Sequence, residues 1–389
     1  MPTKSIIAYT RATDPLEAAR ELSTKIGGSI DGPPDAMILF ASPSWEQGSL
    51  VRAVQQACRP KVLVGASSAG EFTSEARGTG LACALALQSS EMRFAAGIGR
   101  GLSSDRAAAA RAIVSTFRGD EESAPLFRSA LVMTDALAGH ADDLVDELTL
   151  ATSAKYQFFG GGAGDDANFR RTQVFFGDEA VSDAAVALEI LSTKPIGIGV
   201  GHGWEPGGDG MRVTETIGTR LISLNGVPAV EAFEAHALST TQSLDRSSPM
   251  PFFLHNILGI ATATGFRLRV PLAIHPDGSV ECAAEIPRGA VVHIMRTTQS
   301  SAVAAAKRAT EAAIEGLRGN KPRVALFFDC VATRLRMGDA FGLELEELAS
   351  ELGDGAEFAG CNTHGQIARA PGQFGGFHNC TAVVCVLPA

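Results

Sequence analysis

Several features that would assign a class of function are missing from this chain of 389 residues. No apolar run approaches the roughly 18 residues that cross a bilayer, and the opening segment MPTKSIIAYTRATDP lacks the apolar core of a signal peptide. Lysine and arginine form no cluster, and the formal net charge is -10, which disfavours nucleic acid and anionic membrane as partners. We therefore expect a cytoplasmic protein with no nucleic-acid and no membrane partner.

Metal-binding and disulfide patterns are also missing. The seven cysteines form no CxxC pair and lie mostly in apolar runs such as LACALAL and TAVVCVL, which favours buried free thiols. The eight histidines contain neither HxH nor HExxH, so a metal site would have to be assembled from distant segments. We expect His140 and His236 to lie on helices and to face solvent.

Two glycine-rich turns lack the residues that phosphate binding or hydrolysis needs. FFGGGAGDD has no GK[ST] of a P-loop, and GDDANFRR does not resemble the start of a dinucleotide-binding helix. GASSAGEF has Ala69 where a nucleophile elbow needs glycine, two places after Ser67. We interpret both segments as turns at strand ends that require positive φ.

What the chain does contain is one unit repeated three times. The apolar strands KSIIAY and AMILFAS are each followed by a helical segment, and then come the strand KVLVG, the turn ASSAGEF and the strand GLACALALQ. The same order starts again at RSALVMTD and at RVALFFDC. The repeat is too long for a solenoid, so we infer duplication of a domain.

The glycine turns align the copies. The first and third turns correspond through the pairs Gly65 and Gly360, Gly70 and Gly365, and Glu71 and Gln366. The middle turn matches the first, after a one-residue gap, through Ala163, Gly164 and Asp165. A further matched pair, MRFAAGIGRGLSSDRAAAARAIVSTFRG and VVHIMRTTQSSAVAAAKRATEAAIEGLRGN, predicts in each case a strand, a Ser-capped alanine-rich helix and a glycine stop.

Residues 193 to about 290 differ and predict short strands joined by turns, with LNGVP as a turn and HPDGSV as a hairpin. Elsewhere strand pairs follow each glycine turn, while helices separate the other strands. We therefore expect an α+β fold with internal duplication: two related domains whose mixed, largely antiparallel sheets are covered by helices. We place the boundary between the domains near residue 210.

In this order the motifs resemble those of the FIST family, sensory proteins built from an N-terminal and a C-terminal FIST domain. The resemblance covers roughly residues 30 to 387 and rests on KVLVGASSAGEF, FFGGGAGDD, GHGWEPGG, VTETIGTRLISLNGVPAVEAF, FFLHNILGI, LFFDCVATRLRMG and FAGCNTHGQIA. It implies a FIST N-type domain over residues 1–210 and a FIST C-type domain over residues 211–389.

The resemblance also implies a function: a bacterial signal-transduction sensor that binds a small ligand and is not an enzyme. One branch of the family binds haem and senses nitric oxide, so haem is the first ligand to consider, with His378, His202 or His255 as axial ligand. An amino acid or another small metabolite is the alternative. The signal would pass to a separate histidine kinase or cyclic-di-GMP enzyme, and a homo-oligomer is compatible with this role.

We expect the ligand site to be formed by the glycine turns. Its residues are Gly65, Ser67, Gly70, Glu71, Gly162, Gly164, Asp165, Cys361, His364 and Gln366. The family's last turn commonly reads like GFYTYGEI, so in this chain His364 replaces a tyrosine and Gln366 replaces a carboxylate. The histidine favours haem or another metal, whereas the loss of the carboxylate argues against a ligand amine at this turn.

Two other functions stay open. A cysteine-dependent enzyme would use Cys361 or Cys330 as nucleophile and His364 as base, which requires a lowered thiol pKa. A scaffold protein would bind no small ligand.

Overall fold

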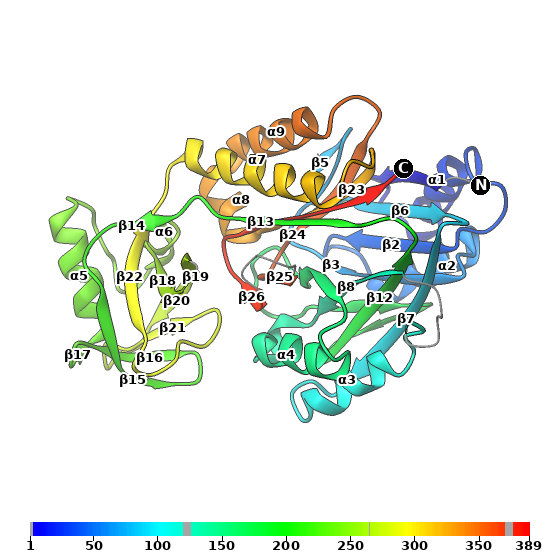
Figure 1. The fold of residues 1–389 in the computed structure, drawn as a ribbon. Coiled ribbons are helices and arrows are strands. Elements are labelled where there is room, and N and C mark those ends of the chain that lie inside the picture. Colours follow the sequence, from blue (N-terminus) through cyan, green and yellow to red (C-terminus); the bar gives the residue numbers. More distant parts are fainter. Residues whose placement is uncertain (1–2, 120–125, 264, 370–375) are drawn as a thin grey trace.

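The computed structural model describes residues 3–119, 126–263, 265–369 and 376–389, and it contains three six-stranded sheets and one smaller lobe (Figure 1). The predicted α+β fold, with mixed sheets covered by helices, is confirmed. In the part of the chain that is described, no helix is both long enough and apolar enough to cross a membrane.

The first sheet shows the plan that the others repeat. In spatial order its strands are β1 (Lys4–Thr10), β6 (Ala82–Gln88), β2 (Ala36–Ala41), β3 (Val62–Ser67), β10 (Val174–Phe176) and β11 (Glu179–Val181). β2 and β3 are parallel, and β6 runs antiparallel between β1 and β2. Helices α1 (Pro15–Gly27) and α2 (Gln47–Cys58) make the connections and pack on one another. The Asp14 carboxylate starts α1 by accepting from two backbone N–H groups.

The second sheet repeats this order. Its strands are β7 (Met92–Arg100), β12 (Ala184–Ser192), β8 (Phe127–Thr134), β9 (Gln157–Gly162), β25 (Gln366–Arg369) and β26 (Gly376–His378). β8 and β9 are the parallel pair, and α3 (Arg106–Val114), the short η1 (Ala136–Ala138) and α4 (Ala141–Ala151) are the connecting helices. His140 precedes α4 and is exposed, as expected.

The third sheet has the same plan. Its strands are β13 (Gly197–Gly201), β27 (Ala382–Pro388), β23 (Pro322–Cys330), β24 (Glu357–Thr363), β4 (Glu71–Thr73) and β5 (Arg77–Gly78). β23 and β24 are parallel, and α8 (Val331–Met337), η2 (Gly338–Phe341) and α9 (Gly342–Leu352) connect them. The long α7 (Gln299–Gly316) lies along β13 and β27.

The three copies interlock because each gives a short hairpin to the sheet of another. The first copy (β1 to β6) gives β4–β5 to the third sheet, and the second copy (β7 to β12) gives β10–β11 to the first. The third copy (β13 together with α7 to β27) gives β25–β26 to the second sheet. Apolar side chains of all three sheets meet in one core, where the Phe328 ring lies 5.7 Å from the Phe40 ring and 6.4 Å from that of Phe159, between centroids. The exchange of hairpins therefore forms a closed cycle: the first copy contributes to the third sheet, the third copy to the second sheet and the second copy to the first sheet.

One sequence match between copies was wrong. The helices α3 and α7 are equivalent, but the strand equivalent to β7 is β13, whereas VVHIMR forms β22 in the separate lobe. The glycine pattern explains the true match: a Cβ on Gly99 would lie 2.3 Å from the Ala109 carbonyl oxygen, and one on Gly199 would lie 1.7 Å from that of Ala309. Both strands need glycine where an alanine-rich helix crosses them closely.

The lobe is inserted between β13 and α7 and forms a nine-stranded sheet, seen at the left of Figure 1. Its strands are β14 (Glu205–Pro206), β15 (Met211–Ile217), β16 (Arg220–Leu224), β17 (Val227–Pro228), β18 (Ile257–Thr262), β19 (Gly265–Arg269), β20 (Pro271–Ile274), β21 (Val280–Cys282) and β22 (Val291–Arg296), with helices α5 (Ala229–Ser239) and α6 (Met250–Phe253). The expected short strands and the hairpin β20–β21 are confirmed. His236 on α5 is half-buried beside Asn256, not solvent-facing as predicted, because α5 packs that side chain against the sheet.

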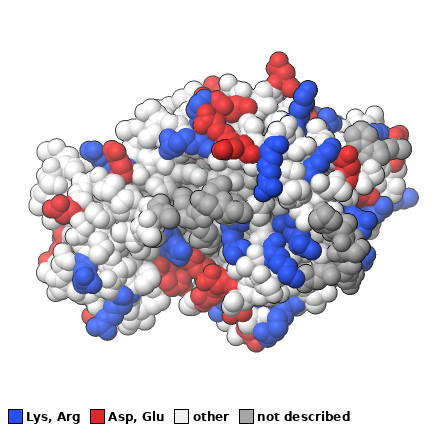
Figure 2. Space-filling view, viewed as in Figure 1, with Lys and Arg blue, Asp and Glu red and all other residues white. Residues whose placement is uncertain are grey.

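The surface carries both signs of charge. On the face shown in Figure 2, lysines and arginines are interspersed with acidic side chains. This mixture agrees with the modest negative charge of the sequence, -10.

Candidate functional site

The three glycine turns come together where the copies meet. Backbone hydrogen bonds join them in a cycle: Ala69 N–H donates to the Asn362 carbonyl at 2.9 Å, Gly164 N–H to Ser67 at 2.8 Å, and His364 N–H to Gly162 at 3.0 Å. Each bond runs from one copy to another. The structure thus places residues from all three turns next to one another, although they lie far apart in the sequence.

These bonds also correct the match of the middle turn. Gly164 makes the bond that Ala69 makes in the first turn, so it corresponds to Ala69 and not to Gly70. Asp165 likewise does not begin a strand as Glu71 does. Its carboxylate instead accepts from the backbone N–H groups of the loop at Phe169, Arg170 and Arg171, at 2.7 to 3.0 Å. The insertion of this loop before β10 explains why the sequence match failed.

Several predicted site residues make contacts that hold the turns together. A Cβ on Gly65 would lie 1.8 Å from the Leu39 carbonyl oxygen, and one on Gly164 would lie 2.6 Å from the Ala69 nitrogen, so close backbone approach explains both glycines. The Ser67 hydroxyl accepts from Gln173 N–H at 3.0 Å. The Gln366 amide donates to the Thr363 hydroxyl at 2.9 Å.

Glu71 is the predicted residue with the most unusual surroundings. Its carboxyl group is fully buried, and burial raises its pKa to about 8, against the lowering effect of hydrogen bonds from the Ser68 hydroxyl and the Leu81 N–H. The group therefore carries a proton at neutral pH. Buried protonated carboxyl groups can donate as well as accept hydrogen bonds, which suits a binding site.

Glu71 lines a cavity of about 410 Å³ between the β4–β5 hairpin of the first copy and the α8–η2 segment of the third. We call it the Glu71 cavity. Its polar lining also includes Arg77, Arg334, Asp339 and Asn362. A volume of this size is within the range of small-molecule pockets, which is about 300 to 1,000 Å³.

Two donors on the wall of this cavity have no partner within the protein. Arg334 Nε and Asn362 Nδ2 are buried and make no hydrogen bond, and Asn362 as a whole is 1% exposed. The side chain of Arg334 packs against Gly70, whose Cβ position would be 3.1 Å from its Cδ, and its guanidinium lies 3.8 Å from Asp166. A buried unpaired donor costs about 1 to 3 kcal/mol, so both groups point to a bound partner.

His364 does not reach the Glu71 cavity. Its ring stacks on Phe169, with centroids 4.6 Å apart, and its Nε2 lies 3.4 Å from the Asp165 carboxylate. Burial lowers its pKa to about 4, so the ring is neutral at pH 7. The histidine thus contacts the inserted loop of the second copy.

Haem does not fit the candidate histidines. His378 is 1% exposed in packed surroundings, His255 is exposed on the surface, and the crevice beside His202 holds only about 10 Å³. A macrocycle needs an enclosed space of several hundred Å³.

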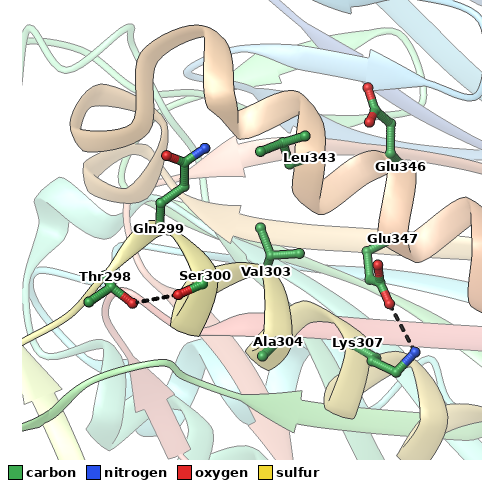
Figure 3. Close-up of a pocket in the computed structure, with 9 residues that line it drawn as sticks. All are labelled: Thr298, Gln299, Ser300, Val303, Ala304, Lys307, Leu343, Glu346 and Glu347. Carbon is green, nitrogen blue, oxygen red and sulfur yellow. Dashed lines mark hydrogen bonds and ion pairs between the residues drawn. The ribbon is translucent and has the colours of Figure 1, made fainter.

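Another hollow is larger but is an open groove of about 780 Å³ between α7 and α9 (Figure 3). Two pairs of its polar side chains contact one another: Lys307 Nζ lies 2.9 Å from Glu347, and the hydroxyls of Thr298 and Ser300 are 3.0 Å apart. It contains none of the predicted site residues. The Glu71 cavity is therefore the better candidate.

Arg334 and Asn362 were not predicted from the sequence as site residues. Asn362 lies within the glycine turn FAGCNTHGQIA, so a polar residue between the two glycines was a usable signal. Arg334 belongs to LFFDCVATRLRMG, and only the fold shows that α8 carries it to the turn of another copy.

Comparison with known proteins finds two family models in this chain. The FIST N domain matches residues 35–227, and the FIST C domain matches residues 229–369. A search of curated proteins finds no match. Similar solved structures include the cyanuric acid hydrolase from A. caulinodans, at 10% identity over 99% of each chain and a TM-score of 0.32. A second cyanuric acid hydrolase, described as an evolutionary innovation by structural concatenation, has 12% identity over the whole of both chains and a TM-score of 0.35.

FIST domains are generally sensory ligand-binding domains of signalling proteins. The two matches together span most of the sequence, in the order that the motifs indicated. The chain belongs to the FIST family.

Proposed function

We propose that this protein is a sensory module that binds a small polar ligand in the Glu71 cavity and signals to a separate partner, a histidine kinase or a cyclic-di-GMP enzyme. One observation carries the proposal: two buried donors without partners, Arg334 Nε and Asn362 Nδ2, line the same cavity as a protonated carboxyl group. All three groups can donate a hydrogen bond. The ligand would therefore present several acceptor oxygens or nitrogens.

The position of the cavity suits a sensor because it lies between copies. Glu71 comes from the first copy, whereas Arg334 and Asn362 come from the third. A ligand that accepts hydrogen bonds from both copies would fix their relative position. A ligand shifts a conformational equilibrium only if it binds one conformation more tightly than the other, and bonds to both copies would provide that preference. A small metabolite with a carboxylate, such as an amino acid, could accept hydrogen bonds from the guanidinium of Arg334.

The structure gives little support to a cysteine-dependent enzyme that uses Cys361. That thiol is 0% exposed, and burial raises its pKa well above the usual range. A thiolate nucleophile needs the opposite shift.

A thermal-shift screen tests the proposal. The wild-type protein, Asn362→Leu and Arg334→Met would be heated with a panel of small polar metabolites, and Gln299→Ala in the α7–α9 groove would serve as the matched control. At a ligand concentration of 100 times Kd, binding stabilises the folded state by about 2.7 kcal/mol. We expect a raised midpoint in the wild type and in the control, and none in the two cavity variants. A shift that persists in both cavity variants would refute the site, and the absence of any shift across the panel would argue for the scaffold role.

A further inference from the structure

A second pocket lies between the second and third copies, apart from the Glu71 cavity. Its volume is about 650 Å³, which is within the range of small-molecule pockets. One wall is formed by the start of β8 and the segment that leads into β9. The other wall is formed by β13 and the C-terminal end of α7, which lie next to each other in Figure 1. We call this space the β13 pocket.

The floor of the β13 pocket is apolar. Ile196 and Ile198 are buried in the common core of the three sheets, and Val200 packs against that core. Phe127 adds an aromatic ring, and Ala312 of α7 adds a methyl group. The removal of such a surface from water by an apolar ligand is favourable, so the floor suits an aliphatic chain.

The rim of the β13 pocket is positively charged. Among the described lining residues, Arg128, Lys155 and Arg318 are cationic, and Glu315 is the one carboxylate. This balance is opposite in sign to that of the whole chain, whose formal net charge is -10. A local excess of positive charge attracts anions and repels cations.

The two arginines of the rim have donors to spare. Arg128 Nε and Nη2 donate to the Gly119 carbonyl at 3.2 and 2.8 Å, and Gly119 N–H donates to the buried Glu189 carboxylate at 3.0 Å. The Arg318 guanidinium lies over the Phe127 ring, with Cζ 5.5 Å from the ring centroid. Within the described parts of the chain, neither arginine forms an ion pair with a carboxylate. Because a guanidinium has five N–H donors, both can still donate to an anion.

We propose that the β13 pocket binds a carboxylate that carries an aliphatic chain. The carboxylate accepts hydrogen bonds from Arg128 and Arg318, since planar guanidinium groups match a pair of carboxylate oxygens. The chain lies on Ile196, Ile198 and Val200. The charge of the rim disfavours a cationic ligand, and the apolar floor disfavours a ligand that is polar throughout.

This inference does not depend on the function proposed for the Glu71 cavity, because the two spaces share no described lining residue. The β13 pocket also joins a different pair of copies. Phe127 and Arg128 belong to the second copy, whereas β13 and α7 belong to the third. A ligand that contacts both walls would stabilise the junction between the second and third copies.

Isothermal titration calorimetry of the full-length protein with decanoate, below its micellar concentration, tests the inference. We expect saturable binding of a single decanoate per chain. Octanoate and hexanoate should bind progressively more weakly, by about fourfold in Kd for each buried methylene that is lost. Decanol keeps the chain and lacks the carboxylate, so it should bind about tenfold more weakly than decanoate.

Variants of the rim locate the binding site. Arg318→Gln removes one charge at an exposed position, so the fold does not depend on it, and decanoate should bind about tenfold more weakly. The double variant with Arg128→Gln should bind more weakly still. Arg308→Gln is the matched control, because it removes the same charge at an exposed position of α7 that does not line the pocket; its Kd should equal that of the wild type.

Three results would overturn the inference. The first is a wild-type protein that shows no saturable binding of decanoate. The second is equal affinity of the wild type for decanoate and decanol, which would show that the rim does not recognise the carboxylate. The third is an unchanged Kd in Arg318→Gln, which would place the bound decanoate elsewhere. The comparison of ligands on the wild type needs no variant, so it holds even if the double variant fails to fold.

Discussion

Asn362 donates its backbone N–H to the carbonyl of Gly70 at 2.8 Å and so joins the third copy to the first. The same residue holds its side-chain amide, unpaired, at the wall of the Glu71 cavity. A single position therefore serves both the assembly of the copies and the candidate site. Ligand contact at this amide would act directly on the junction between the two copies.

The close approach of β2 and β3 at Gly65 predicts that a single added methyl group destabilises the folded protein. Gly65→Ala would place a Cβ 1.8 Å from the Leu39 carbonyl oxygen, within the pairing of β2 and β3. We expect a loss of about 1 to 3 kcal/mol in the free energy of unfolding, as for other overpacked sites. Urea denaturation measures it. Gly27→Ala is the control, since nothing lies within 4 Å of its Cβ position; equal stability of the two variants would contradict the packing argument.

The buried carboxyl of Glu71 predicts a pH dependence of stability. Its folded pKa is raised from 4.5 to about 8, so the folded state holds the proton more tightly than the unfolded state does. The stabilisation is complete below the unfolded pKa and is lost as the pH rises through about 8. Unfolding free energies of wild type and Glu71→Gln, measured between about pH 5 and pH 8, should diverge in slope, with the wild type falling more steeply. Parallel curves would show that Glu71 is ionised in the folded protein.

The buried ring of His364 predicts a pH dependence of stability that is opposite in sign to that of Glu71. Burial lowers its pKa from 6.5 to about 4, so the unfolded state binds the proton more tightly. The wild type should lose stability as the pH falls from about 6.5 to about 4, and His364→Gln should lose less over that interval. His293→Gln on β22 of the separate lobe is the control. NMR of the ring resonances would report the pKa directly, and a value near 6.5 would contradict the buried neutral histidine.

A buried ion pair attaches the lobe to the second copy. Arg269 on β19 is 1% exposed, and its Nη2 lies 2.6 Å from the carboxylate of Asp142 on α4, which also accepts from Phe377 N–H. Asp142→Ala leaves the guanidinium buried without its partner and should cost about 3 to 5 kcal/mol. The double variant with Arg269→Met should recover part of that loss. A double-mutant cycle by denaturation gives the coupling, and a value near zero would show that the pair does not hold the lobe.

The sequence predicted the α+β class and the threefold duplication because each copy keeps the same order of strands and the same glycine turn. It did not predict that β4–β5, β10–β11 and β25–β26 cross to other sheets, since strands of two to four residues carry too little pattern to specify a partner. The division of the chain near residue 210 stays a prediction.

The sequence indicated the three glycine turns, but it did not indicate most of the residues that line the Glu71 cavity. Glu71 was identified from its glycine neighbours, whereas Arg77 and Arg334 reach the cavity from a hairpin and from a helix whose places depend on contacts between copies. The residues that flank these positions in the sequence do not indicate contacts between copies. The position of His364 depends on contacts between copies as well, because its ring packs on Phe169 and lies beside Asp165 of the second copy; its role in ligand binding stays a prediction.

The most direct test of ligand binding in the Glu71 cavity is a crystal structure of the protein soaked with the metabolite that gives the largest thermal shift. We expect density for the ligand in the Glu71 cavity, within hydrogen-bond distance of Asn362 Nδ2 and Arg334 Nε. Ligand density in the α7–α9 groove, with the Glu71 cavity holding none, would contradict it.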